Sequence, residues 1–254
     1  MADRDEMVGV TWSLEQDSEQ EQVPYEPHVG QSRQYWRDII LGVNDGLVST
    51  YLLVAGVVGA GLESRTILLT AVAGAVAGAV SMGAGEYLAT RTQEEVFDAE
   101  ERLERTHIKH FKPQEVEQMR GFIRDMGVSE DAVEPVVRAF AEDDETLLNA
   151  MKALEFGIID SERRSPYAAM IASGLLFMLG SLTSAVPFFF DVAPSTGLFW
   201  ASIATAVGLF LVGVAKTRVT RTNPFTAGLQ NLIIAGLGGI VAFYIGRAFG
   251  ATFI

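Results

Sequence analysis

The chain has 254 residues, of which 49% are hydrophobic, and its formal net charge is −13. It contains no cysteine, which excludes disulfides, thiolate zinc sites and cysteine nucleophiles, and its acidic balance argues against nucleic acid as a partner. The charges crowd into residues 1–38 and 91–165, and the remainder is nearly free of them. This segregation predicts a membrane protein that carries a soluble insert.

The N-terminal segment, residues 1–34, is polar and acidic. It lacks the basic and apolar regions of a signal peptide, so we expect a disordered acidic tail.

Five apolar stretches are each long enough to cross a bilayer core of about 30 Å as a helix. They lie near residues 38–60, 66–90, 167–190, 197–215 and 226–249. The expected fold is all-α: a polytopic membrane protein with transmembrane helices one and two in residues 35–90 and helices three to five in residues 166–254. Pro187 is expected to distort the end of the third span.

Basic residues in short loops predict the orientation, because they accumulate on the cytoplasmic side. One side of the predicted membrane carries Arg33, Arg37, Arg91, Arg163, Arg164, Lys216, Arg218 and Arg221. The other side has only Arg65 and Arg247. We therefore expect the N-terminus and the insert in the cytoplasm and the C-terminus outside.

The insert, residues 91–165, is predicted to form three or four helices between spans two and three. Pro113 stands near the start of one helix, Gly127 near its end, and Ser129 at the cap of the next. Residues 92–165 hold 19 Asp and Glu against 10 Lys and Arg. Such a surface attracts cations.

Asp45 interrupts the first apolar stretch, in "GVNDGLVST". A carboxylate at a helix centre costs at least ~2.5–3.5 kcal/mol on insertion scales. It could pair with a polar group of a neighbouring helix or cap a break beside Gly46. The alternative that we favour is a carboxylate lining a route for protons or cations, since intramembrane ionisable groups mark such routes.

Gly74, Gly78, Met82 and Glu86 follow one another at intervals of four and share one face of the second span. The glycines are explained by close helix packing. Met82 alone would be a packing residue, but a thioether beside a carboxylate favours a borderline transition metal over Na⁺ or Mg²⁺. Glu86 either takes part directly or lies hydrated at the interface.

Candidate metal ligands are dense in the insert. Several carboxylates and two histidines share a helix face at i, i+3 or i+4 spacing: Glu100, Glu101, Glu104, His107 and His110. Glu115 and Glu117 follow Pro113, and Met151 and Glu155 form an i, i+4 pair. A solvated charged helix surface is the alternative explanation of this pattern.

Several blocks of the chain carry a family resemblance: "YWRDIILGVNDGLVSTYLLVAGVVGAG", "AGAVSMGAGEYLATRTQEE", "AMKALEFGI", "SPYAAMIASGLLFMLGSLTSAVPF" and "NPFTAGLQNLIIAGLGGIVAFYIGR". Together they resemble the vacuolar iron transporter family, over about residues 32–250. The resemblance implies a dimeric five-helix transporter that moves Fe²⁺, and often Mn²⁺, out of the cytosol in exchange for protons. It implies that Asp45 and Met82 line the path. It also implies that a cytoplasmic helical domain collects metal through Glu104, Glu115, Met151 and Glu155.

The chain departs from the family pattern at four positions. A pathway glutamate of some members is replaced by Gly74, two domain glutamates by His107 and Gln118, and a second domain methionine by Lys152. His107 remains a competent ligand for Fe²⁺ or Mn²⁺, so these changes bear on metal preference and stoichiometry.

The leading hypothesis is a divalent transition-metal/proton antiporter, without enzymatic activity or a resident cofactor. Its pathway residues are Asp45, Met82 and Glu86. Its metal-collecting residues are Glu101, Glu104, His107, Glu115, Met151 and Glu155. The expected partners are Fe²⁺ or Mn²⁺, protons, the lipid bilayer and a second copy of the chain.

The expected location is a prokaryotic inner membrane, with a vacuolar-type membrane as the alternative. A second hypothesis is a membrane-anchored metal sensor or buffer without transport. A third, a ferroxidase-like enzyme, would need paired Glu-x-x-His motifs, and the chain has one such spacing, Glu104 to His107.

Overall fold

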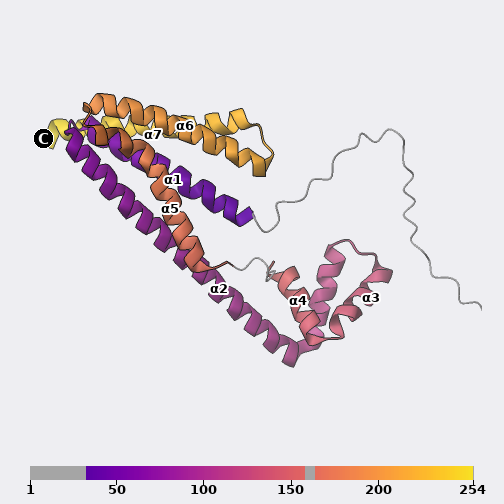
Figure 1. Ribbon diagram of the computed structural model, residues 1–254. Helices are drawn as coiled ribbons and strands as arrows, with labels where there is room; N and C mark the ends of the chain where they lie inside the picture. Colours follow the sequence, from indigo (N-terminus) through magenta and orange to yellow (C-terminus); the bar gives the residue numbers. More distant parts are fainter. Residues whose placement is uncertain (1–32, 158–163, 254) are drawn as a thin grey trace, which may run out of the picture. The chain divides into compact units, whose positions relative to one another are not determined.

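The computed structural model describes residues 33–157 and 164–253. These residues form seven α-helices and a short 3₁₀ helix, with no strand among them (Figure 1). The helices are α1 (Arg33–Gly59), α2 (Ser64–Asp125), α3 (Glu130–Ala141), α4 (Asp144–Glu155), α5 (Pro166–Ala185), η3 (Val186–Phe190), α6 (Pro194–Thr220) and α7 (Pro224–Phe253). The predicted all-α class is confirmed. The tail predicted for residues 1–34 lies outside the described residues except for Arg33 and Gln34, which are helical.

Five helices are long and apolar enough to cross a membrane, as the sequence predicts. They are Tyr35–Gly59, Ser64–Asp125, Pro166–Phe190, Pro194–Arg218 and Pro224–Thr252. The distortion expected at Pro187 is confirmed: α5 ends at Ala185, and the chain continues as the tighter helix η3.

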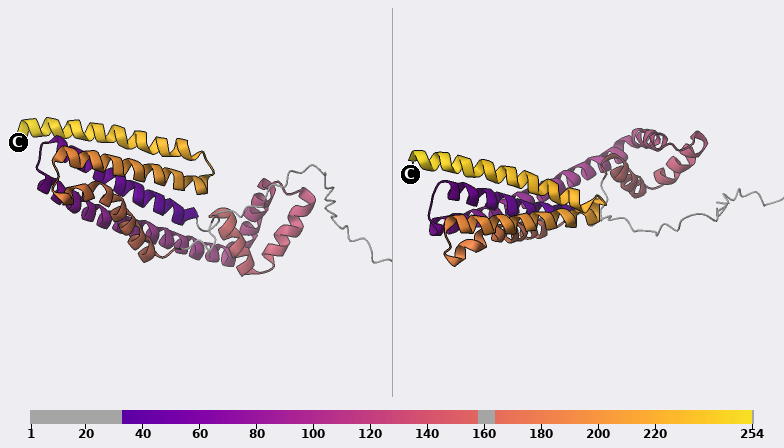
Figure 2. Two further views of the ribbon diagram at one scale, coloured as in Figure 1. Left: turned by 45° about the horizontal axis from the view of Figure 1, so that its top comes forward. Right: turned by 90° about the horizontal axis from the view of Figure 1, so that it is seen from above.

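Helix α1 packs against four other helices of the membrane bundle, α2, α5, α6 and α7. Figure 2 shows α6 and α7 close together at the end where a short turn joins them, and its right-hand view shows them diverging toward the other end. Small residues permit these close approaches. A methyl group added at Gly46 of α1 would overlap the carbonyl oxygen of Phe177 in α5, and one added at Gly78 of α2 would overlap the ring of Phe177. Phe177 therefore contacts both α1 and α2, the two helices that carry the acidic residues Asp45 and Glu86.

Helix α2 continues beyond its apolar part without a break until Phe111, whose backbone (φ −134°, ψ 29°) is not helical. The cause is Pro113, which lacks an N–H and clashes with the preceding turn. The chain changes direction there, and the last part of α2 packs with α3 and α4. Of the insert predicted for residues 91–165, the structure describes residues 91–157, 164 and 165.

The insert has an apolar core of its own, drawn from all three helices. Its buried members are Ile108, Met119, Ile123, Val133, Val137, Leu147, Leu148 and Met151. Gly127 (φ +85°) and Gly157 (φ +64°) end α2 and α4 in the left-handed conformation that favours glycine. Ser129 stands at the N-cap position of α3, although its side chain makes no capping hydrogen bond. The helix boundaries expected at Gly127 and Ser129 are confirmed.

Candidate functional site

A cavity of about 420 Å³ lies between α1, α2 and α5. It is lined by Asp45, Ser49, Thr50, Leu53, Gly74, Gly78, Ser81, Met82, Gly85, Glu86 and Phe177. The three residues predicted for a transport path, Asp45, Met82 and Glu86, thus share one cavity within membrane-spanning helices. Two of the α2 glycines let side chains of other helices approach closely, since Gly74 contacts Leu53 and Gly78 contacts the ring of Phe177, whereas Gly85 faces open space.

Asp45 is held in place from its own helix. The hydroxyl of Ser49, one turn later, donates a hydrogen bond of 2.6 Å to Oδ1 of Asp45. Thr50 turns its hydroxyl away, to Ser181 of α5 at 2.9 Å. The amide oxygen of Asn44 is buried without a hydrogen-bond partner among the described residues. The Asp45 carboxylate and the Ser49 hydroxyl bonded to it are therefore the polar groups that α1 offers to the cavity.

Met82 and Glu86 supply the α2 side of the cavity, one helical turn apart. Both side chains are partly buried. A thioether and two carboxylates around one cavity form a mixed soft and hard donor set, which suits a borderline divalent transition metal better than an alkali ion.

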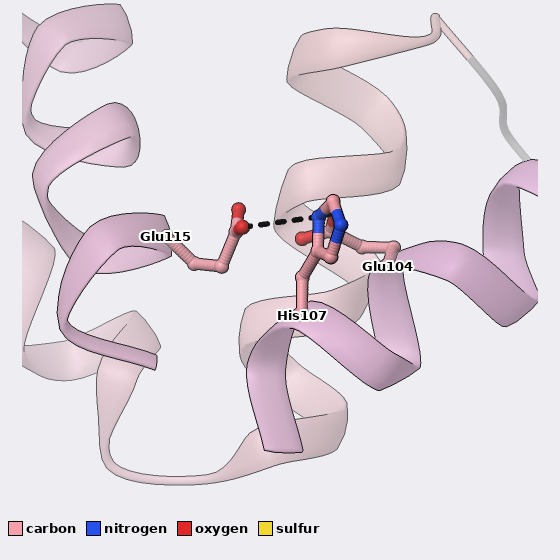
Figure 3. Close-up of side chains that lie close together, drawn as sticks. All are labelled: Glu104, His107 and Glu115. Atoms are coloured by element: carbon pink, nitrogen blue, oxygen red, sulfur yellow. Dashed lines mark ion pairs between the residues drawn. The ribbon is translucent and has the colours of Figure 1, made fainter. Parts of the chain in front are cut away.

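A second group of potential metal ligands lies in the insert. Glu104, His107 and Glu115 each offer a ligand atom, and these atoms all lie within 4.8 Å of one another. Figure 3 shows the three side chains pointing toward one another. Nδ1 of His107 lies 3.3 Å from Glu115 and 3.9 Å from Glu104. We call these three residues the insert cluster.

The two glutamates of the insert cluster are buried, with exposed fractions of 2% for Glu104 and 5% for Glu115. One oxygen of each, Oε1 of Glu104 and Oε2 of Glu115, has no hydrogen-bond partner among the residues that the structure describes. Burial, together with the neighbouring charges of Glu115 and Glu155, raises the pKa of Glu104 to about 7. Unpaired buried carboxylates are costly by themselves, and a cation bound between them would offset that cost.

The other residues predicted as ligands in the insert lie around this cluster. Glu155 is close enough for its charge to act on Glu104, whereas Met151 is fully buried in the apolar core. Glu101 is engaged otherwise: its carboxylate lies 3.1 Å from both Lys152 and Arg105, and the ion pair with Lys152 lowers its pKa. Lys152 itself is only 4% exposed.

Sequence reasoning missed one group of residues, at the Glu86 end of the cavity. Arg37 and Arg164 each form ion pairs there with Asp38 and Glu86. In the sequence, the two arginines serve only as markers of orientation. Contacts of Arg164 with α1 and α2 join distant segments, so no local pattern could have revealed them.

The family model described as "VIT family" matches residues 36–247, which is most of the chain. The chain belongs to the VIT family. Among its relatives, Vacuolar iron transporter 1 of Tulipa gesneriana is 29% identical over 84% of this chain and 86% of its own length. The protein of the same name from Arabidopsis thaliana is 26% identical over 83% of this chain and 84% of its own length. Protein CCC1 of Saccharomyces cerevisiae is 23% identical over 84% of this chain and 68% of its own length.

Membership of the VIT family confirms the resemblance that the sequence blocks carry, and it agrees with an integral membrane protein. The relatives are named as transporters, which is not an enzymatic function. Iron in their names is cargo rather than a cofactor, so this VIT-family chain is a transporter-type protein without an indicated cofactor.

Proposed function

We propose that this protein exports Fe²⁺ or Mn²⁺ from the cytosol across a membrane in exchange for protons. The observation that carries the proposal is the cavity in which Asp45, Met82 and Glu86 come together between α1, α2 and α5. Asp45 takes up either the metal ion or a proton, because one carboxylate does not hold both at once. A proton that arrives from the side opposite the cytosol then binds Asp45 and releases the metal. The metal-free site afterwards becomes accessible from the cytosol again.

The insert cluster gives the metal a first binding place in this scheme. Glu104, His107 and Glu115 provide two carboxylates and an imidazole, which Fe²⁺ and Mn²⁺ both accept. The acidic surface around them raises the local cation concentration. The distribution of arginine and lysine supports a cytoplasmic insert and N-terminus. Both a prokaryotic inner membrane and a vacuolar-type membrane fit export from the cytosol.

A second copy of the chain is part of the proposal. Ser49 and Ser81 line the cavity yet are exposed on the surface of a single chain, and polar groups facing lipid are unfavourable. On α2, small exposed residues recur at every fourth position: Ala73, Ala77, Ser81 and Gly85. Two such α2 faces, one from each copy of the chain, pack closely, and their contact would shield the cavity from lipid.

The dimer is tested by Ala77→Leu, with Ala172→Leu as the matched control on an exposed position of α5. The molar mass of the protein in detergent and the number of subunits per liposome are measured. We expect Ala77→Leu to yield monomers and the control to remain dimeric. A monomeric wild type that transports metal would overturn the dimer.

Transport is tested in proteoliposomes that contain a pH dye, with Fe²⁺ and Mn²⁺ supplied separately. Wild type is compared with Asp45→Asn, which keeps an acceptor for the Ser49 hydroxyl, and with Asp131→Asn, an exposed carboxylate of α3. We expect metal entry coupled to proton movement in wild type and in the α3 variant, and neither in Asp45→Asn. Full transport by Asp45→Asn would refute the mechanism.

A membrane-anchored metal sensor or buffer is the second candidate, and the insert cluster is the observation that favours it, since it needs no path through the membrane. In that case the solubilised protein binds metal, no metal crosses the liposome membrane, and Asp45→Asn leaves binding unchanged.

A further inference from the structure

Two arginines and two acidic residues meet at the end of the cavity where Glu86 lies. Nη1 of Arg164 lies 2.7 Å from Oδ2 of Asp38, and Nη2 of the same guanidinium donates a hydrogen bond of 3.4 Å to Oε1 of Glu86. Arg37 lies 3.4 Å from Asp38 and 3.8 Å from Glu86. One guanidinium at the start of α5 therefore joins a carboxylate of α1 to a carboxylate of α2.

Arg164 is the inner member of this group and Arg37 the outer one. The side chains of Arg164, Asp38 and Glu86 are 10%, 8% and 16% exposed, whereas that of Arg37 is 67% exposed. The guanidinium of Arg164 also lies over the ring of Tyr35, 5.9 Å from its centre. Its Nη1 makes the ion pair with Asp38 but is aligned for no hydrogen bond among the described residues.

Glu86 has two competing uses in this arrangement. It lines the cavity one turn away from Met82, where a metal ion would need its oxygens. The same carboxylate is neutralised by Arg164. A fixed cation thus lies beside Glu86 in the cavity wall, and a mobile cation has to compete with it for this carboxylate.

We propose that the guanidinium of Arg164 competes with metal ions for Glu86 at the entry to the cavity, and that an incoming divalent metal ion displaces this guanidinium from Glu86. The closer contact with Asp38 keeps the displaced guanidinium nearby, so that it returns to Glu86 after the ion has moved on. Arg164 is then a positioning residue for transport, acting through Glu86. This inference rests on the function proposed above.

The experiment measures Mn²⁺ uptake by proteoliposomes as a function of Mn²⁺ concentration, normalised to folded protein. Removing the competing cation in Arg164→Gln lowers the KM for Mn²⁺ about fivefold, the size expected for one partly screened ion pair. Arg164→Lys keeps the charge and stays near the wild-type KM. Arg91→Gln, which removes an exposed arginine paired with Glu95 on α2, is the matched control and leaves the KM unchanged.

A structural role for Arg164 gives a different result. If Arg164 only fastens the helices together, Arg164→Gln lowers the amount of folded protein or the maximal rate and leaves the KM unchanged, which would overturn the proposal. If Arg164 acts through Glu86, the double variant Glu86→Gln/Arg164→Gln has the KM of Glu86→Gln alone. A further fall in KM in the double variant contradicts that route.

A second measurement separates this inference from the proposed function. Mn²⁺ binding to solubilised protein is followed by electron paramagnetic resonance, in a background where the insert cluster is disabled by Glu104→Gln, His107→Ala and Glu115→Gln. Should the wild type transport no metal, the proposed function fails. Tighter Mn²⁺ binding on adding Arg164→Gln would still support the role of Arg164, and equal binding would refute it.

Discussion

Nδ1 of His107 lies 3.3 Å from Oε1 of Glu115, although the two residues stand on opposite sides of the kink at Phe111. In a straight α-helix, with a rise of about 1.5 Å per residue, they would be roughly 12 Å apart along the axis. The kink therefore creates the insert cluster, because it turns Glu115 back toward Glu104 and His107 (Figure 3).

The first prediction concerns the imidazole of this cluster. His107→Ala should weaken Mn²⁺ binding by the insert about tenfold or more, since loss of even an outer partner of a metal site costs about 10–100-fold. His110→Ala is the matched control, because His110 is exposed on the same helix and outside the cluster. Isothermal titration of the two variants checks this. Equal affinities in both would rule out His107 as a ligand.

The second prediction concerns Glu104, whose pKa is raised from 4.5 to about 7 by burial and by its acidic neighbours. The folded, metal-free protein keeps this proton between about pH 4.5 and 7, whereas the unfolded chain has lost it. Stability therefore falls as pH rises through this window, by roughly 2–3 kcal/mol in total, and stays low above pH 7. Metal binding displaces the proton, so metal affinity rises over the same range.

Thermal unfolding in EDTA at pH 6 and pH 8 tests this dependence. We expect Glu104→Gln to raise the unfolding temperature at pH 8 more than at pH 6, because the amide carries no charge into the buried site. Glu142→Gln, at an exposed position beside α3, serves as the control and should follow the wild type. A wild type with the same pH dependence as Glu104→Gln would contradict the assignment.

Much of this architecture was predictable because its signals are local. A membrane span is a continuous apolar run, and the turns at Gly127 and Gly157 depend on single residues that adopt a positive φ. Glu104 and His107 also share a helix face at i, i+3 spacing, which the pattern of the sequence reveals.

The remaining features depend on contacts between distant segments. Pro113 indicated a helix boundary, but not that the chain would fold Glu115 back onto His107. Arg164 was a charge beside a span, and its ion pairs with Asp38 and Glu86 connect the segment before α5 to α1 and α2. Lys152 stood in the sequence only as the replacement of a family methionine, and nothing local indicated that it would be buried beside Glu101, since lysine is seldom buried.

The third prediction uses this buried lysine. Its ammonium lies 3.1 Å from Glu101, which stands one turn before Glu104. Lys152→Met keeps the apolar volume, removes a positive charge near the insert cluster and releases Glu101 from this ion pair. We expect metal affinity to rise about three- to tenfold, which is the size of effect expected for one partly buried charge pair. Lys109→Met, an exposed lysine on α2, is the control, and titration with Mn²⁺ measures both.

If Lys152→Met binds metal no more tightly than wild type, the ammonium does not compete with the ion. Double substitution Glu101→Gln/Lys152→Met separates the two contributions. If the double variant lacks the increase in metal affinity, the increase comes from the released Glu101 carboxylate. If the double variant keeps the increase, it comes from the removal of the positive charge.

The fourth prediction concerns the contact between α1 and α5 that shapes the membrane cavity. A methyl group at Gly46 would overlap the backbone carbonyl of Phe177, which no side-chain rotation relieves. Gly46→Ala should therefore separate the two helices and destabilise the protein by about 1–3 kcal/mol, the usual range for overpacking. Because Phe177 and Asp45 both line the cavity, metal transport should fall as well.

Gly236→Ala in α7 is the matched control, since a methyl group there meets no atom within 4 Å and alanine favours the helix. Unfolding in detergent and uptake by proteoliposomes are measured for both variants. Stability and transport equal to wild type in Gly46→Ala would mean that α1 and α5 are not in backbone contact at this point. A loss confined to Gly46→Ala would instead tie the small residue after Asp45 to the geometry of the cavity.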